Sequence, residues 1–190
     1  MSVCSLITLG LSPDCDNPLI AGVNDRLILF NKSEVSSIGY NVTNTEIVES
    51  ITLTSAAVGY AFQGQNFSNE PSSRAVVGRY AKRVEHQVDF LIFGESGAVK
   101  AQLNKMLQGK FVAVVQNNFE GTDGDAAFTM YGTTQGMQVM EMEQLKYDQE
   151  TLGAYRISLK SYDQALEAKL PNAVHITDLS TTLAMIDALL

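Results

Sequence analysis

The residue best placed for chemistry is Ser96, in the segment 94–98 (GESGA) between an expected strand and an expected helix. A nucleophile elbow presents its serine at the same kind of turn, and His175 with Asp163 or Asp178 would complete the catalytic triad of an esterase. That elbow belongs to repeated strand-helix units, whereas this chain consists mostly of short alternating segments joined by turns. We therefore predict that Ser96 caps a helix, and a serine esterase is the distant alternative.

Two groups of acidic residues could also bind or catalyse. Glu141 and Glu143 lie two positions apart in an expected strand and so share a face, as the paired carboxylates of a glycosidase would. The polar residues around them favour a solvated or channel-lining surface instead. Asp123 and Asp125 offer oxygen ligands in a tight loop, but their spacing lacks the acidic twelfth position of an EF-hand, so we predict a turn.

Other reactive side chains are few. The chain has two histidines, His86 and His175, which is too few for most transition-metal sites and acid-base mechanisms. His86 is predicted as a strand-face residue. Cys4 and Cys15 could form a disulfide, but the sequence favours two free thiols in a reducing cytosol, and two cysteines are too few for a zinc site. The sequence contains no glycine-rich phosphate loop. We therefore expect no metal, no cofactor and no enzymatic activity.

Composition and charge narrow the class of protein. A chain of 190 residues that is 45% hydrophobic can bury a substantial core, and no shift in composition divides it, so we expect one domain over residues 1–190. The net charge of −8 repels phosphate, so tight binding of nucleic acid or of an anionic membrane is not expected, although DNA could slide past such a surface. No window reaches the roughly 18 apolar residues of a membrane span.

The segment 84–115 carries the clearest structural pattern. Residues 84–92 alternate with the period of a half-buried strand, and the apolar positions then change to helical spacing up to residue 107. Ser96 is placed to cap this helix, and Gly109 lies where a left-handed residue often ends one. Residues 111–115 predict a short buried strand.

The rest of the chain predicts further strands and one more helix. Turn-forming residues at 117–125 predict a hairpin, and Asp178 or Ser180 can cap a C-terminal helix whose apolar side chains need a partner surface. We expect a mainly β fold, an antiparallel sandwich or barrel, with one flanking helix, an N-terminal arm at 1–20 and a C-terminal extension at 172–190. The remaining predicted strands are 25–30, 46–53, 58–62, 127–131, 137–147 and 155–159, with 46–53 and 58–62 expected to pair.

Between residues 63 and 83 the alternating pattern stops. This stretch is polar, is interrupted by glycine and proline, and concentrates positive charge in an acidic chain. Irregular loops of this length are uncommon inside compact domains and are often functional, so we predict an extended loop that docks on another subunit, with a solvated loop as the alternative. Its candidate interface residues are Arg74, Arg79, Tyr80, Lys82 and Arg83.

The order of these elements resembles the tail-tube proteins of bacteriophages and their relatives in contractile injection machines. The likeness is carried by residues 63–83, 88–107 and 111–116, and it covers about residues 20–165. The stretches AFQGQNFSNEPSSR, KMLQGKFVAVVQNN and AFTMYGTTQGMQV are similar to virion structural proteins of phages that infect Bacteroidetes.

This resemblance implies a non-enzymatic virion protein made in the host bacterium. In such proteins a β-sandwich or barrel with one helix at its side joins its neighbours edge to edge, six copies close a ring, and a long loop contacts the next ring. The resemblance implies that Glu141 and Glu143 face the lumen, that DNA passes without specific binding, and that sheath, terminator or baseplate proteins are partners. A neck, terminator or connector ring protein is the alternative within a virion. A monomeric binding module is the alternative outside one.

Overall fold

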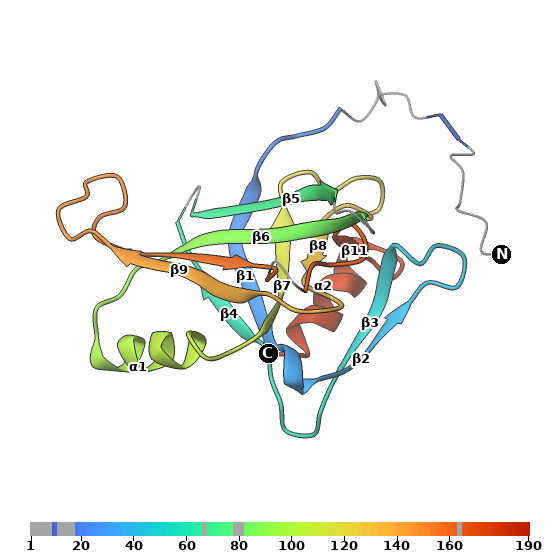
Figure 1. The fold of residues 1–190 in the computed structure, drawn as a ribbon. Helices are drawn as coiled ribbons and strands as arrows, with labels where there is room; N and C mark the ends of the chain where they lie inside the picture. The colour runs from blue at the N-terminus through green and yellow to red at the C-terminus, as the bar shows by residue number, and fades with distance from the viewer. Residues whose placement is uncertain (1–8, 11–17, 66–67, 78–81, 163–164) are drawn as a thin grey trace.

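The computed structural model describes residues 9–10, 18–65, 68–77, 82–162 and 165–190. These residues form two β-sheets with two α-helices packed against them (Figure 1). The fold is therefore mainly β, as the sequence predicts. Neither helix in the described part of the chain is long and apolar enough to cross a membrane.

The larger sheet has seven strands in the order β2-β3-β11-β8-β7-β1-β4. All neighbours pair antiparallel except β11 and β3, which are parallel. Its central strands β1 and β7 are buried on both faces, because another layer covers each side of the sheet. The strand bounds are β1 Val23–Asn31, β2 Val35–Tyr40, β3 Ile47–Leu53, β4 Tyr60–Gln63, β7 Phe111–Asn117, β8 Phe128–Tyr131 and β11 Asn172–Val174, and a short helix η1, Lys32–Glu34, follows β1.

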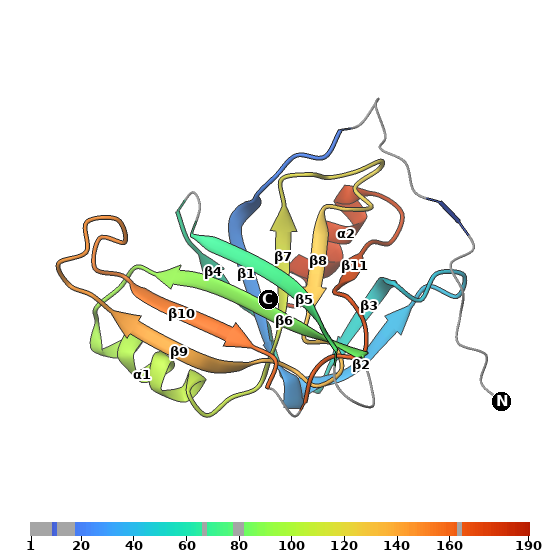
Figure 2. The ribbon, with the colours of Figure 1, turned by 45° about the horizontal axis from the view of Figure 1, so that its top comes forward.

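The smaller sheet has four strands in the order β5-β6-β10-β9, antiparallel throughout (Figure 2). The burial of β6 and β10 alternates residue by residue, which shows that one face of this sheet packs on the core and the other does not. The strand bounds are β5 Asn69–Val77, β6 Lys82–Ile92, β9 Gln138–Gln144 and β10 Tyr155–Lys160.

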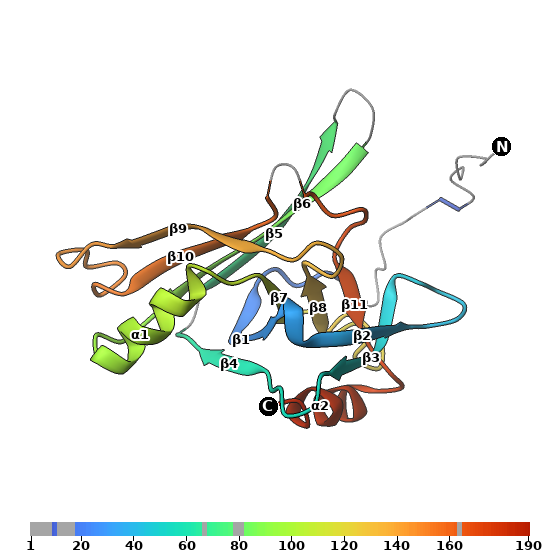
Figure 3. The same ribbon diagram turned by 60° about the horizontal axis from the view of Figure 1, so that its bottom comes forward.

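Two cores lie on opposite faces of the seven-stranded sheet. On β1, Leu27 and Leu29 face the four-stranded sheet, and Ile28 and Phe30 face the other way, as the two-residue period of a strand requires. Helix α1, Gly97–Met106, contributes Leu103 and Met106 to the first core. Helix α2, Leu179–Asp187, covers the second core, so the layers run sheet, sheet, helix (Figure 3).

Several local predictions are confirmed. Ser96 caps α1, Asp178 caps α2, and β7 and β8 form the predicted hairpin around residues 117–125. The left-handed role predicted for Gly109 is wrong, because this residue is not among the glycines of positive φ. A Cβ at Gly109 would lie 2.4 Å from the ring of Phe111, so the glycine provides space for that ring.

Two predictions about strands are wrong. The segment 58–62 supplies β4, which pairs with β1, while β3 pairs with β2 and β11. The loop expected over 63–83 contains the strand β5, which forms nine residue pairs with β6. The partner surface that the apolar C-terminal helix was expected to need lies within the chain, because β11 joins the seven-stranded sheet and α2 packs on the second core.

Candidate functional site

The outer face of the four-stranded sheet is polar along all four strands. Residues on this face alternate with the core residues, and the strand register places them side by side. Val76 and Leu91 are its apolar members, and five carboxylates against four cations leave it with one net negative charge. The face consists of Glu70, Ser72, Arg74 and Val76 on β5, Arg83, Glu85, Gln87, Asp89 and Leu91 on β6, Arg156, Ser158 and Lys160 on β10, and Gln138, Glu141 and Glu143 on β9.

Glu141 and Glu143 lie together on this face, next to a hollow of about 230 Å³ that Asp89 and Arg156 also line. Glu143 lies opposite Arg156 in the register, and Glu141 lies opposite Ser158. Within the described residues, neither glutamate forms an ion pair. The arrangement is a shallow acidic surface around a single guanidinium, and its exposed carboxylates are available to an external cation.

A second charge cluster lies near the other end of the face, around Glu85. This carboxylate is only 6% exposed, and it accepts hydrogen bonds from Nη2 of Arg74 at 3.0 and 3.2 Å. The ammonium of Lys160 lies 3.3 Å from the same carboxylate. Two cations therefore share one anion, and the side chain of Arg74, which is 70% exposed, carries charge that Glu85 does not fully neutralise.

The two outer strands of this sheet, β5 and β9, have unpaired edges in the described part of the chain. An edge strand presents unsatisfied N–H and C=O groups that can pair with another strand. Strand β5 contains Pro71, and β9 contains a bulge in which Met140 has no partner on β10. Both features are typical of edge strands, since they limit uncontrolled pairing while leaving room for a specific partner.

The hairpin of β5 and β6 extends beyond the other two strands. Strand β10 pairs with residues 87–92 of β6, so the half of the hairpin that contains Lys82 and Arg83 continues past it (Figure 3). Both of these cations are exposed. Three of the five predicted interface residues therefore lie on one hairpin, and Arg79 and Tyr80 lie outside the described residues.

The structure does not bring together Ser96 and His175, two members of the triad that the esterase alternative requires. The Ser96 hydroxyl accepts a hydrogen bond from the Val99 amide at 3.3 Å, as a helix cap does. Asp178 caps α2, where hydrogen bonds from the Thr181 amide and nearby hydroxyls lower the carboxyl pKa to about 2. Because α1 and α2 pack on opposite faces of the seven-stranded sheet, Ser96 and His175 do not meet. Asp163 lies outside the described residues, as do Cys4 and Cys15.

The acidic loop between β7 and β8 is a turn, as predicted. Asp123 and Gly124 have φ values of 56° and 84°, and the Asp125 amide donates to the Thr122 carbonyl at 3.1 Å. Within the described residues, no cluster of three or more histidine, cysteine or acidic side chains is arranged to hold a metal ion.

His86 and Glu167 form a buried polar cluster that the sequence did not reveal. The His86 ring accepts from the Gly132 amide at Nδ1 and lies 3.0 Å, through Nε2, from the Lys169 carbonyl. Burial lowers its pKa, against the opposing effects of that carbonyl and of the Glu167 charge. Glu167 accepts from three consecutive amides at residues 134–136. Through these hydrogen bonds the cluster joins residues 132–136 to the segment that contains Glu167 and Lys169.

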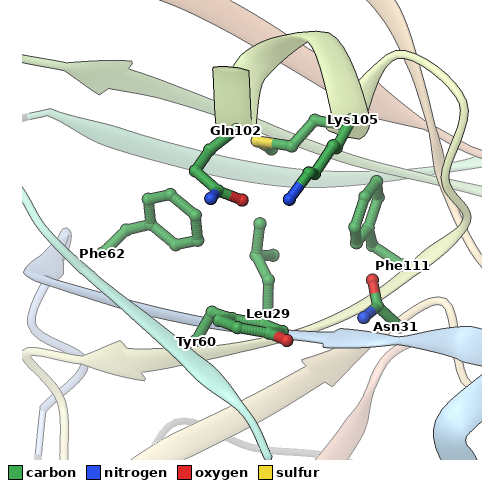
Figure 4. Close-up of a pocket in the computed structure, with 8 residues that line it drawn as sticks. Leu29, Asn31, Tyr60, Phe62, Gln102, Lys105 and Phe111 are labelled. Carbon is green, nitrogen blue, oxygen red and sulfur yellow. The ribbon is translucent and has the colours of Figure 1, made fainter. Parts of the chain in front are cut away.

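A groove of about 370 Å³ separates α1 from the seven-stranded sheet (Figure 4). Gln102 and Lys105 point from α1 into it, above Leu29, and the remaining walls are largely aromatic. The amide of Gln102, the ammonium of Lys105 and the hydroxyl of Tyr60 could contact a ligand above this apolar floor, and no carboxylate or histidine is among the lining residues. The lining residues are Leu29, Asn31, Tyr60, Phe62, Gln102, Lys105, Met106 and Phe111.

No protein-family profile, curated protein or solved structure matches this chain.

Proposed function

We propose that this protein is a structural subunit that closes into a ring around a channel, and that stacked rings form the tail tube of a phage-like particle. The observation that carries the proposal is the four-stranded sheet, which combines a largely polar outer face with two edges that pair with no other strand in the described part of the chain. A soluble globular domain gains little from long open edges, whereas a ring removes them by pairing each subunit with the next.

The strand directions are compatible with such a ring. The sheet has an even number of strands and every neighbouring pair is antiparallel, so its outer strands β5 and β9 run in opposite directions. When copies are related by rotation about a common axis, β9 of one copy meets β5 of the next in antiparallel orientation. The ring is then one continuous antiparallel barrel, and its interface is heterologous and closed.

The resulting channel has a suitable width. Six copies of a four-stranded sheet make a barrel of 24 strands, which is about 45–50 Å across for a strand spacing of about 4.8 Å and a tilt of about 40°. Side chains on the wall reduce the opening to roughly 35–40 Å, since each layer of side chains takes about 5 Å. The outer face lines this opening, where the exposed carboxylates of Glu70, Glu141 and Glu143 repel the DNA backbone.

The test is the mass of the purified protein over a range of concentrations, together with negative-stain images. Rings that stack into tubes with a central channel support the proposal, and single rings that never stack favour a neck or connector role instead. A monomer at every concentration contradicts it.

Two variants of Met140, the bulged residue of β9, test whether the ring closes by pairing of β9 with β5 of the next copy. Met140→Pro removes one backbone donor and stiffens the edge, while Met140→Ala keeps the donor. We expect proline, but not alanine, to abolish rings while both variants stay folded by circular dichroism. Rings that persist in the proline variant would show that β9 does not close the ring.

A further inference from the structure

We propose that ring closure pairs Arg74 on β5 of one copy with Glu141 and Glu143 on β9 of the next, so that the surface around these residues recognises a second copy of this chain. This inference deepens the proposed function and rests on it. The observations behind it are the register of the four strands, the fixed stagger of a barrel, and the unshared charges at the two edges.

The register defines a common level across the sheet. Glu70, Asp89, Ser158 and Glu141 are successive partners on β5, β6, β10 and β9, and they form one row perpendicular to the strands. In a flat arrangement without stagger, Glu141 of one copy would therefore meet Glu70 of the next. Two carboxylates would then lie opposite each other, which is unfavourable.

A barrel does not close without stagger. Strands tilted by about 35–45° and spaced by about 4.8 Å move by roughly 13–19 Å along the strand direction over four strands, which is about four to six residues. The shift must be an even number of residues, because an odd one would turn the polar face of the next copy toward the core. A shift of four sets Glu141 opposite Arg74, and a shift of six sets Glu143 opposite Arg74.

The direction of the shift follows from the extent of β5. A shift away from the hairpin tip would set Glu141 opposite residues 64–66, which precede the first residue of β5, Asn69. Almost the whole of β9 would then lack a partner. A shift of four toward the tip sets the whole of β9 opposite β5, and a shift of six sets five of its seven residues there, along the half of the hairpin with which β10 does not pair.

The charges at the two edges are complementary in this register. Lys160 also forms an ion pair with Glu85, so the largely exposed guanidinium of Arg74 can contact a second carboxylate. Glu141 and Glu143 have no ion-pair partner among the described residues. In either even register, one glutamate lies directly opposite Arg74 and the other lies on the diagonal, within reach of a long side chain.

The experiment is a charge swap scored by ring formation. Arg74→Glu, and separately Glu141→Arg with Glu143→Arg, should each raise the concentration needed for rings by roughly tenfold or more, because like charges then face each other across every interface. Combining the three substitutions should restore rings. The matched control is Lys100→Glu, the same change of charge on α1, which should leave rings intact.

Cysteine pairs test the register without relying on charge. In a background with Cys4→Ser and Cys15→Ser, Arg74→Cys combined with either Glu141→Cys or Glu143→Cys should give covalent multimers under oxidation, while Glu70→Cys with Glu141→Cys should not. Rings in the Arg74→Glu variant at the wild-type concentration, or cross-linking only through Glu70, would overturn this inference while leaving ring formation itself established. Absence of rings from the wild-type protein would instead overturn the proposed function.

Discussion

Replacing Glu167 by glutamine should destabilise the protein although it removes a buried charge. This side chain is 1% exposed, and its two oxygens accept from the amides of Thr134 and Gln135 at 2.9 Å and of Gly136 at 3.2 Å. A glutamine can retain the two bonds made by one oxygen, but its amino group then faces the third amide. The variant keeps the shape of the side chain and changes only its charge and its hydrogen bonding.

The magnitude follows from those bonds. Leaving one partly buried amide without an acceptor costs about 1–3 kcal/mol, and the two retained bonds lose the strength that a charged acceptor gives them. Removing the carboxylate also removes its desolvation cost, which offsets part of the loss. Together these effects predict a destabilisation of about 2–3 kcal/mol, or a fall in melting temperature of roughly 4–12 °C for a chain of this size.

The assay is urea and thermal unfolding of wild type and Glu167→Gln, with amide hydrogen exchange at residues 134–136. Exchange should accelerate there, because Glu167 anchors the segment that connects β10 to β11 and thereby links the two sheets. Glu150→Gln, at an exposed position, is the matched control and should change stability by less than about 0.5 kcal/mol. A melting temperature for Glu167→Gln that equals the control's would refute the reasoning.

Three further predictions concern single residues. Burial lowers the pKa of His86 below its ordinary value of 6.5, so the neutral ring stabilises the fold above pH 6.5 and this stabilisation is lost as the pH falls below that value. In urea titrations, the difference in stability between wild type and His86→Gln should therefore shrink from pH 8 to pH 5. A difference that stays constant over this range would contradict the lowered pKa. Ser96→Ala should cost about 0.5–1 kcal/mol through loss of the cap on α1, and hydrolysis of an activated ester that disappears in this variant would revive the esterase alternative. Gly109→Ala should destabilise by about 1–3 kcal/mol in thermal unfolding, because the new Cβ would lie 2.4 Å from the ring of Phe111 unless that ring moves, and unchanged stability would mean that the ring moves freely.

Local order was largely determined by the sequence. The period-two pattern of residues 84–92, the apolar run that begins at Phe111 and the caps Ser96 and Asp178 each act through neighbours a few residues away, so their structural outcome can be predicted from the chain. The mainly β class followed from the same short-range signals.

Which strands pair, and which groups Glu167 contacts, was decided only by the tertiary structure. Strand β5 has no apolar alternation because most of its residues are exposed, and its regularity comes from the hydrogen bonds that β6 supplies across the hairpin. Strand β4 pairs with β1 instead of the nearby β3, because proximity along the chain does not determine which sheet edge is free. Glu167 is an ordinary surface-type residue in the sequence, and it becomes an anchor only where the fold brings three amides around it. Side-chain periodicity is set by immediate neighbours, whereas strand order and buried polar contacts are set by segments that meet only in the folded chain.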